Sequence, residues 1–161
     1  MKKLIFVRHG KAEDLSPDIH DFERSLTLRG KTISREMARS LMKKTNDPGI
    51  MITSPAFRAL ETALIFAMEY GIAPEKVRMA DILYTRSDLG SLLTLLSEVN
   101  EEPDTVTLFG HNPAFTLIPN SLCTESFDTL PKSGVICLSF RIKTWQELMP
   151  DSGKMEFLLK P

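Results

Sequence analysis

The stretch Leu4-Ile5-Phe6-Val7-Arg8-His9-Gly10 decides the fold of this chain. Its four apolar residues are typical of a short buried strand, and the glycine indicates where that strand ends. We expect Arg8 and His9 to lie at the mouth of a sheet, on backbone that the core holds in place. An imidazole there can attack phosphorus while a guanidinium holds the phosphoryl oxygens. The tripeptide alone leaves a second interpretation open, in which a strand simply ends in polar residues.

Length and composition favour a single domain over residues 1–161. A chain of 161 residues with 42% hydrophobic residues is long enough to bury one core. The 20 basic and 21 acidic side chains nearly balance, so no strong field favours binding to DNA or to an anionic membrane. We therefore expect neither a nucleic-acid partner nor a membrane partner, whereas a local anion site stays open.

The two cysteines, Cys123 and Cys137, are too few for a disulfide framework, and neither lies in a CxxC motif. Such cysteines are more often buried apolar groups in a reduced compartment. The sequence shows no signal-peptide pattern and no apolar run as long as a membrane span. We expect a cytoplasmic protein and a monomer.

Apolar runs and amphipathic segments alternate through the first two-thirds of the chain. The predicted strands are residues 4–7, 50–53, 77–80, 105–109, 134–142 and 155–159. The predicted helices are residues 29–44, 54–69, 88–99 and 112–122, and residues 11–23 form a polar loop. This alternation predicts a three-layer α/β/α domain with a mostly parallel sheet. The last two strands have little between them, which predicts an antiparallel edge.

Two segments combine a helix-capping residue with a following proline, Ser54-Pro55 and Asn112-Pro113, and both are predicted to open helices. Arg58 then falls in the first turn of its helix, where the helix dipole disfavours a cation by about 0.3–1 kcal/mol. An anion bound at that helix start would offset this cost.

The ends of three predicted strands carry chemically related residues. The first strand ends in Arg8 and His9, the second leads to Arg58, and the third is followed by His111. In an open α/β sheet, ligands bind outside the carboxyl ends of the strands. Each histidine alone is more often structural than catalytic, but the joint arrangement favours an anion site with a nucleophile. His20 lies in the polar loop, where we expect it to be solvated.

A metal site is the competing interpretation of the histidines. His9 and His111 could supply two ligands, but the sequence has no HExxH or other clustered ligand spacing. The neighbouring arginines would also repel a cation. We expect no metal and no cofactor.

Several motifs along the chain occur together in a characteristic order. They are Arg8-His9-Gly10-Lys11-Ala12-Glu13, Ser25-Leu26-Thr27-Leu28-Arg29-Gly30, Ser54-Pro55-Ala56-Phe57-Arg58-Ala59, Thr62-Ala63 and Gly110-His111-Asn112-Pro113. Together they resemble the histidine phosphatase superfamily, which includes the cofactor-dependent phosphoglycerate mutases, and most closely its SixA-type phosphohistidine phosphatases. The resemblance covers essentially the whole chain and implies the phosphoglycerate mutase-like fold.

The resemblance also implies roles for the matching residues. His9 would be the catalytic nucleophile that becomes transiently phosphorylated, and Arg8, Arg58 and His111 would form the phosphate pocket around it. These residue types fit phosphoryl transfer, which needs positioning and electrostatic stabilisation above all. Because His9 must be neutral at its attacking nitrogen, we expect its other nitrogen to donate to a backbone carbonyl.

The chain departs from the superfamily where many members carry a glutamate that protonates the leaving oxygen. The corresponding stretch, Leu83-Tyr84-Thr85, has no carboxylate, although Asp81 and Asp88 flank it. Glu13 is a further candidate for the general acid. A positioned acid contributes about 10²- to 10⁴-fold to the rate when the leaving group is an alkoxide. An imidazole leaving group needs it less, because its second nitrogen can carry the proton.

The expected activity is therefore a metal-independent phosphohistidine phosphatase with a phospho-His9 intermediate. Between Arg58 and His111 the chain is too short for a lid, and the open pocket this implies suits a side chain presented by another protein. The expected partner is a phosphohistidine-bearing signalling or phosphotransfer protein. Two alternatives remain: a phosphatase for small phosphate esters, and a non-catalytic phosphoprotein-binding module.

Overall fold

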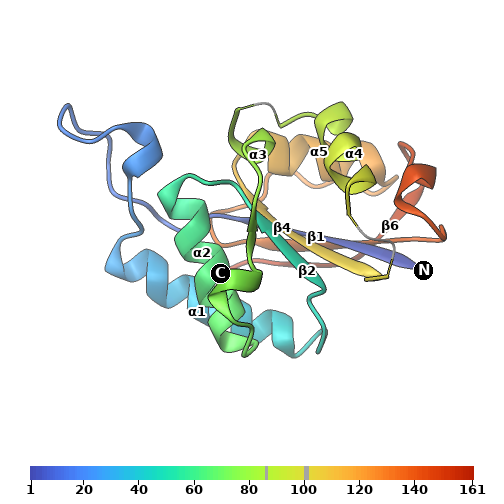
Figure 1. Cartoon of the computed structure of the whole chain (residues 1–161), viewed down its shortest axis with the longest axis horizontal. Helices are drawn as coiled ribbons and strands as arrows, with labels where there is room; N and C mark the ends of the chain where they lie inside the picture. Colours follow the sequence, from blue (N-terminus) through green and yellow to red (C-terminus); the bar gives the residue numbers. More distant parts are fainter. Residues whose placement is uncertain (86, 100–101) are drawn as a thin grey trace.

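The computed structural model describes residues 1–85, 87–99 and 102–161. It shows a six-stranded sheet with helices on both faces, which confirms the predicted α/β/α layers (Figure 1). In chain order the strands are β1 (Lys2–Arg8), β2 (Ile50–Thr53), β3 (Arg78–Met79), β4 (Thr105–Gly110), β5 (Val135–Phe140) and β6 (Gly153–Leu159).

The sheet is mostly parallel and antiparallel on one side, as predicted. Its strand order is β3-β2-β4-β1-β5-β6. The four strands β3, β2, β4 and β1 pair in parallel, whereas β5 runs antiparallel to both β1 and β6. In the central pair, Val7 lies opposite Phe109 and Arg8 opposite Gly110. The residues that follow β1 and β4, His9 and His111, are therefore brought to the same edge of the sheet.

Helices cover both faces of the sheet (Figure 1). One face carries α1 (Leu28–Met42) and α2 (Phe57–Glu69), and the other carries α3 (Ile82–Thr85), α4 (Leu89–Ser97) and α5 (Ala114–Leu122). Three short 3₁₀ helices, η1 (Asp21–Glu23), η2 (Pro74–Lys76) and η3 (Trp145–Glu147), lie in the connections.

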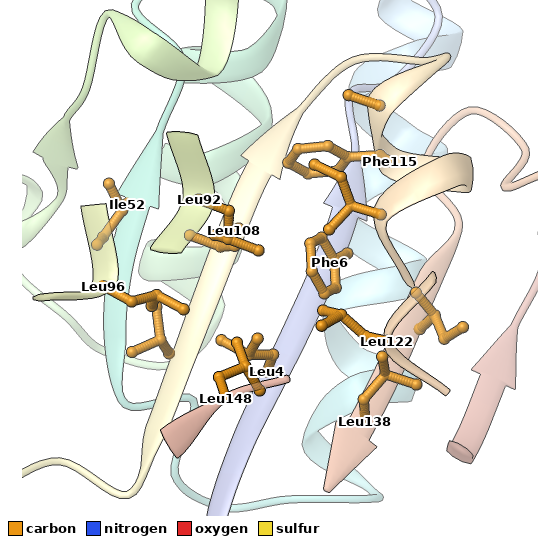
Figure 2. Close-up of a cluster of buried hydrophobic side chains, with 14 of the residues drawn as sticks. Leu4, Phe6, Ile52, Leu92, Leu96, Leu108, Phe115, Leu122, Leu138 and Leu148 are labelled. Atoms are coloured by element: carbon orange, nitrogen blue, oxygen red, sulfur yellow. The ribbon is translucent and has the colours of Figure 1, made fainter. Parts of the chain in front are cut away.

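The central strand β1 contributes to a separate core on each face. Leu4 and Phe6 pack with the α4 and α5 side, where the ring of Phe6 meets that of Phe115 edge to face at 5.4 Å (Figure 2). Ile5 and Val7 pack with the α1 and α2 side. A strand covered on both faces has no polar face, which explains the continuous apolar run in the sequence.

The structure corrects two predicted helix starts. Helix α2 begins at Phe57 with Ala56 as its N-cap, so Ser54 is not the cap, and Ser54 Oγ accepts the Ala56 N–H at 3.3 Å in a turn before the helix. Helix α5 begins at Ala114 after a cis Asn112–Pro113 bond. In both places the proline lies in the connection between strand and helix, before the first helical residue.

Three further element predictions differ from the structure. The predicted strand over residues 77–80 is shortened to the two residues of β3, and helix α3 was not predicted at all. Helix α1 begins at Leu28 because Thr27 is its cap, its side chain accepting the Gly30 N–H at 3.0 Å. Among the described residues, the longest apolar helices fall short of what a membrane crossing requires.

Candidate active site

His9 is held at the end of β1 with one ring nitrogen engaged and the other available. Its Nδ1 lies 2.7 Å from the carbonyl oxygen of Gly10, and its side chain is buried. A carbonyl oxygen can only accept, so Nδ1 carries the proton and Nε2 keeps its lone pair. Burial, together with the positive charges of Arg58 and Arg8, lowers the pKa of His9 to about 3. His9 is therefore neutral at pH 7, and its Nδ1 bonds a backbone carbonyl as expected from the sequence.

Hydrogen bonds from two distant segments hold the backbone on either side of His9. The N–H of Gly10 donates to Thr62 Oγ1 at 3.1 Å, which ties the loop to α2. The N–H of Ser133 lies 3.1 Å from the carbonyl oxygens of both Arg8 and His9, which ties it to the turn before β5. His9 thus stands on backbone that these hydrogen bonds hold in place, as a preorganised site requires.

Both arginines of the predicted set come to this edge of the sheet, each with part of its guanidinium in use. Arg8 donates from Nη1 to the Leu130 carbonyl at 2.9 Å. Arg58, in the first turn of α2, donates from Nη1 to the Asp21 carbonyl at 2.6 Å and from Nη2 to Asp21 Oδ2 at 3.0 Å. The Nε of each arginine is buried without a hydrogen-bond partner.

His111 follows β4 and lies beside His9, with 5.0 Å between the ring centroids. Its Nε2 is 2.8 Å from Ser54 Oγ, and its Nδ1 is buried without a partner. Burial, helped by the charge of Arg58, lowers the pKa of His111 to about 4. His111 is therefore neutral at pH 7, where it can still donate one hydrogen bond.

The buried nitrogens without a partner are the main chemical feature of the site. Within the described part of the chain, three such nitrogens are Arg8 Nε, Arg58 Nε and His111 Nδ1. Buried polar nitrogens are nearly always hydrogen-bonded in folded proteins, so these three are available to bind an acceptor. An oxyanion among these side chains would supply it. The donor set suits an anion, and the described residues contain no cluster of three potential metal ligands.

Asp21 is a carboxylate that the fold brings to this site, and the sequence did not indicate it. Its Oδ2 accepts from Arg58 Nη2 and, at 3.3 Å, from the hydroxyl of Tyr84, while its Oδ1 accepts from Arg24. Burial raises the pKa of Asp21, but its bonds to Arg24 and Arg58 outweigh that effect and hold the pKa below its usual range. Asp21 is ionised at pH 7.

The other carboxylates considered from the sequence have different surroundings. The Glu13 carboxylate is exposed and accepts the Ser25 N–H at 3.3 Å. Asp88 caps α4 by accepting the Ser91 N–H at 2.7 Å. The assignment of Glu13 as the general acid stays a prediction.

A groove opens beside His111 on the α5 side of the site. Its volume is about 410 Å³, and its walls come from α3, the start of α4, residues 111–113 and α5. Most of the lining is apolar, including Leu83, Leu89, Ala114, Leu117 and Ile118. Tyr84 closes the groove toward Asp21, its ring packing edge to face on His111 at 5.7 Å.

Comparison with known protein sequences finds a relative of this chain, although not a matching family model. No protein-family model matches it. An uncharacterized protein from Picosynechococcus sp. (strain ATCC 27264 / PCC 7002 / PR-6) is 34% identical over 113 residues, which cover 69% of this chain and 67% of that protein.

Solved structures share the fold over nearly the whole chain. A protein from Agrobacterium tumefaciens, proposed to be the phosphohistidine phosphatase SixA, has a TM-score of 0.80 at 23% identity, covering 99% of this chain and 98% of that one. The protein histidine phosphatase SixA complexed with tungstate has a TM-score of 0.77 at 21% identity, and the match covers 98% of this chain and 96% of that one. A mycobacterial glucosyl-3-phosphoglycerate phosphatase in complex with inorganic phosphate has a TM-score of 0.69 at 16% identity, and the match covers 98% of this chain and 96% of that one.

The strand order and helix layers described above are thus those of a known architecture, as the motifs predicted. This chain belongs to the same family as the Picosynechococcus protein, and it has the phosphoglycerate mutase-like fold that these solved phosphatases share.

Proposed function

We propose that this chain is a metal-independent phosphohistidine phosphatase that acts on a phosphoprotein through a phospho-His9 intermediate. The observations that carry the proposal are the free Nε2 of His9 and the three buried, unpartnered nitrogens of Arg8, Arg58 and His111, the ring of His111 lying 5.0 Å from that of His9. The solved relatives with tungstate and with inorganic phosphate bind oxyanions on the same fold, which supports the assignment of an oxyanion to this set.

In the first step, Nε2 of His9 attacks the phosphorus and the bond from phosphorus to the substrate nitrogen breaks. The phosphoryl group passes to His9, and the substrate imidazole leaves with a proton on its other nitrogen. In the second step, water attacks phospho-His9, the P–N bond breaks, and inorganic phosphate is released with His9 neutral again. The loose transition state of both steps needs charge stabilisation, which Arg8 and Arg58 supply.

The groove beside His111 favours a protein substrate over a sugar phosphate. A polyhydroxylated leaving group would leave hydroxyls unpaired against apolar walls such as Leu117 and Ile118. A phosphohistidine on a protein surface could instead place neighbouring apolar side chains there. The expected partner is a signalling or phosphotransfer protein.

Small phosphate esters are the second candidate substrate class. The glucosyl-3-phosphoglycerate phosphatase among the structural neighbours acts, by its name, on such an ester. A phosphoprotein-binding module without turnover is disfavoured, because the hydrogen bond from His9 Nδ1 to Gly10 keeps Nε2 free for attack.

The test is phosphate release in the presence of EDTA. A phosphotransfer protein phosphorylated on histidine is compared with a panel of small phosphate esters, and His9→Ala serves as the blank. Faster release from the phosphoprotein supports the proposal. Faster release from an ester retains His9 as nucleophile but moves the function to small molecules, and no release from any substrate supports the binding module.

A further inference from the structure

Asp21 holds Arg58 through two separate groups. Its backbone carbonyl accepts from Nη1 at 2.6 Å and its carboxylate accepts from Nη2 at 3.0 Å. Arg58 itself is nearly buried, with 6% of its surface exposed. These contacts use the outer part of the guanidinium and leave Nε without a partner.

The segment that carries Asp21 is itself held in place. Arg24 donates to Asp21 Oδ1 from Nε at 3.1 Å and from Nη2 at 2.6 Å, and reaches back to the Glu13 carbonyl at 2.7 Å. The ring of Phe22 packs against Phe57, next to Arg58, and against Tyr84. Asp21 therefore approaches Arg58 from a packed segment.

We propose that Asp21 is a positioning residue of the candidate site: by binding the outer N–H groups of Arg58, it fixes the guanidinium so that its Nε faces the phosphoryl oxygens. The proposal rests on the proposed function, because it assigns the partner of Arg58 Nε to a phosphoryl group. A guanidinium has five N–H donors in a rigid plane, so one carboxylate can hold it while other donors remain for the substrate.

The opposite role, a carboxylate that blocks the oxyanion position, does not fit the contacts. A carboxylate in that position would accept from Arg8 Nε, Arg58 Nε and His111 Nδ1, yet all three lack a partner with Asp21 in place. The recorded acceptor bonds of its side chain go to Arg58 Nη2, Arg24 and Tyr84.

The two roles predict opposite signs for tungstate binding. Removing a negative charge near the site should tighten an oxyanion by Coulomb attraction alone. If Asp21 positions Arg58, its removal should instead weaken tungstate binding. The charge-assisted hydrogen bond from Arg58 to the Asp21 carboxylate is then lost, and the guanidinium is no longer held in one orientation. The expected loss is about ten-fold or more for Asp21→Ala, and a smaller loss for Asp21→Asn, which keeps an acceptor.

The experiment is calorimetric titration of tungstate into the whole chain, with Glu23→Ala as the matched control. Glu23 is exposed in the same 3₁₀ helix and carries the same charge. Weaker tungstate binding by Asp21→Ala with unchanged binding by Glu23→Ala supports the proposal. Equal or tighter binding by Asp21→Ala overturns it.

Two further measurements keep the test decisive. Thermal unfolding shows whether Asp21→Ala is folded. If it is not, tungstate binding is measured with Asp21→Asn and with Tyr84→Phe, and each is expected to lose a few-fold in tungstate affinity. Phosphate release by the wild type is measured separately. Wild type that binds tungstate without turnover overturns the proposed function, whereas the effect of Asp21→Ala on binding still decides the role of Asp21.

Discussion

The hydroxyl of Ser54 lies 2.8 Å from Nε2 of His111, joining the segment after β2 to the end of β4. Ser54 Oγ already accepts the N–H of Ala56, so its own proton is available to the imidazole. When Nε2 accepts that proton, Nδ1 of the neutral ring carries the hydrogen. We infer that Ser54 donates this bond, so that the unpartnered nitrogen of His111 is a donor at pH 7.

Ser54→Ala should lower kcat/KM for phosphate release. Without the hydroxyl, His111 is free to place its hydrogen on Nε2 and to turn a lone pair toward the oxyanion. The expected loss is about five- to ten-fold, the value of one neutral hydrogen bond. Ser40→Ala is the control, since that hydroxyl donates to the Glu36 carbonyl within α1. An unchanged kcat/KM for Ser54→Ala would contradict this tautomer.

The buried histidines should make stability fall in mild acid. Burial lowers the pKa of His9 to about 3 and that of His111 to about 4, whereas an unfolded histidine titrates near about 6.5. Between these values the unfolded chain binds more protons than the folded one. The contribution of these two histidines to the free energy of unfolding is therefore fully present above about pH 6.5, and it decreases as the pH falls toward the pKa values of the folded state.

Denaturant unfolding of the wild type and of His111→Asn at about pH 7 and about pH 5 measures this effect. The wild type should lose more unfolding free energy between the two pH values than the variant, because the variant lacks one of the two histidines. An equal loss in both proteins would show that His111 is not responsible.

Gly30→Ala should damage both stability and activity. A Cβ at Gly30 would overlap the backbone carbonyl oxygen of Lys11, two residues after His9. Relief requires moving that loop, at a cost of about 1–3 kcal/mol in unfolding free energy. Gly90→Ala is the matched control, because the nearest atom to its Cβ is Asp88 Oδ1 at 3.5 Å, so this change should be neutral or stabilising by up to about 1 kcal/mol. Denaturant midpoints measure the change in stability, and phosphate release measures the change in activity.

Leu117→Asp should separate protein substrates from small ones. Leu117 is 63% exposed on α5 and lines the groove beside His111. A charge there should raise KM for a phosphoprotein several-fold and leave turnover of p-nitrophenyl phosphate unchanged. Met68→Asp is the control, since Met68 is similarly exposed, at 59%, but lies on α2 across the sheet. Equal impairment of both substrates by Leu117→Asp would argue against docking in the groove.

Local sequence patterns were sufficient to predict the strands whose ends carry His9 and His111. Short apolar runs ending in polar residues located β1 and β4, and parallel pairing of these strands then brings His9 and His111 together. Such patterns depend on residues close in sequence, which is why they succeed for strands and for the amphipathic helices.

The features that the sequence did not reveal depend on distant contacts. Asp21 reaches Arg58 across 37 positions and Tyr84 across 63, and no periodicity encodes either pair. The start of α2 was misplaced because Ser54 satisfies the cap-and-proline pattern, but its hydroxyl bonds Ala56 and His111 in the segment before the helix. A residue with a role in the site thus broke the local rule that was used to predict the helix.

The central claim is that the phosphoryl group passes through His9. The most direct measurement is rapid quenching, under alkaline conditions, of the wild type during turnover of a histidine-phosphorylated protein, followed by mass spectrometry of the peptide that contains His9. The account predicts one added phosphoryl group on His9 that appears and decays within the turnover time, and none on Asn in the variant His9→Asn. Phosphate release without any phosphorylated His9, or equal release by His9→Asn, would contradict the account.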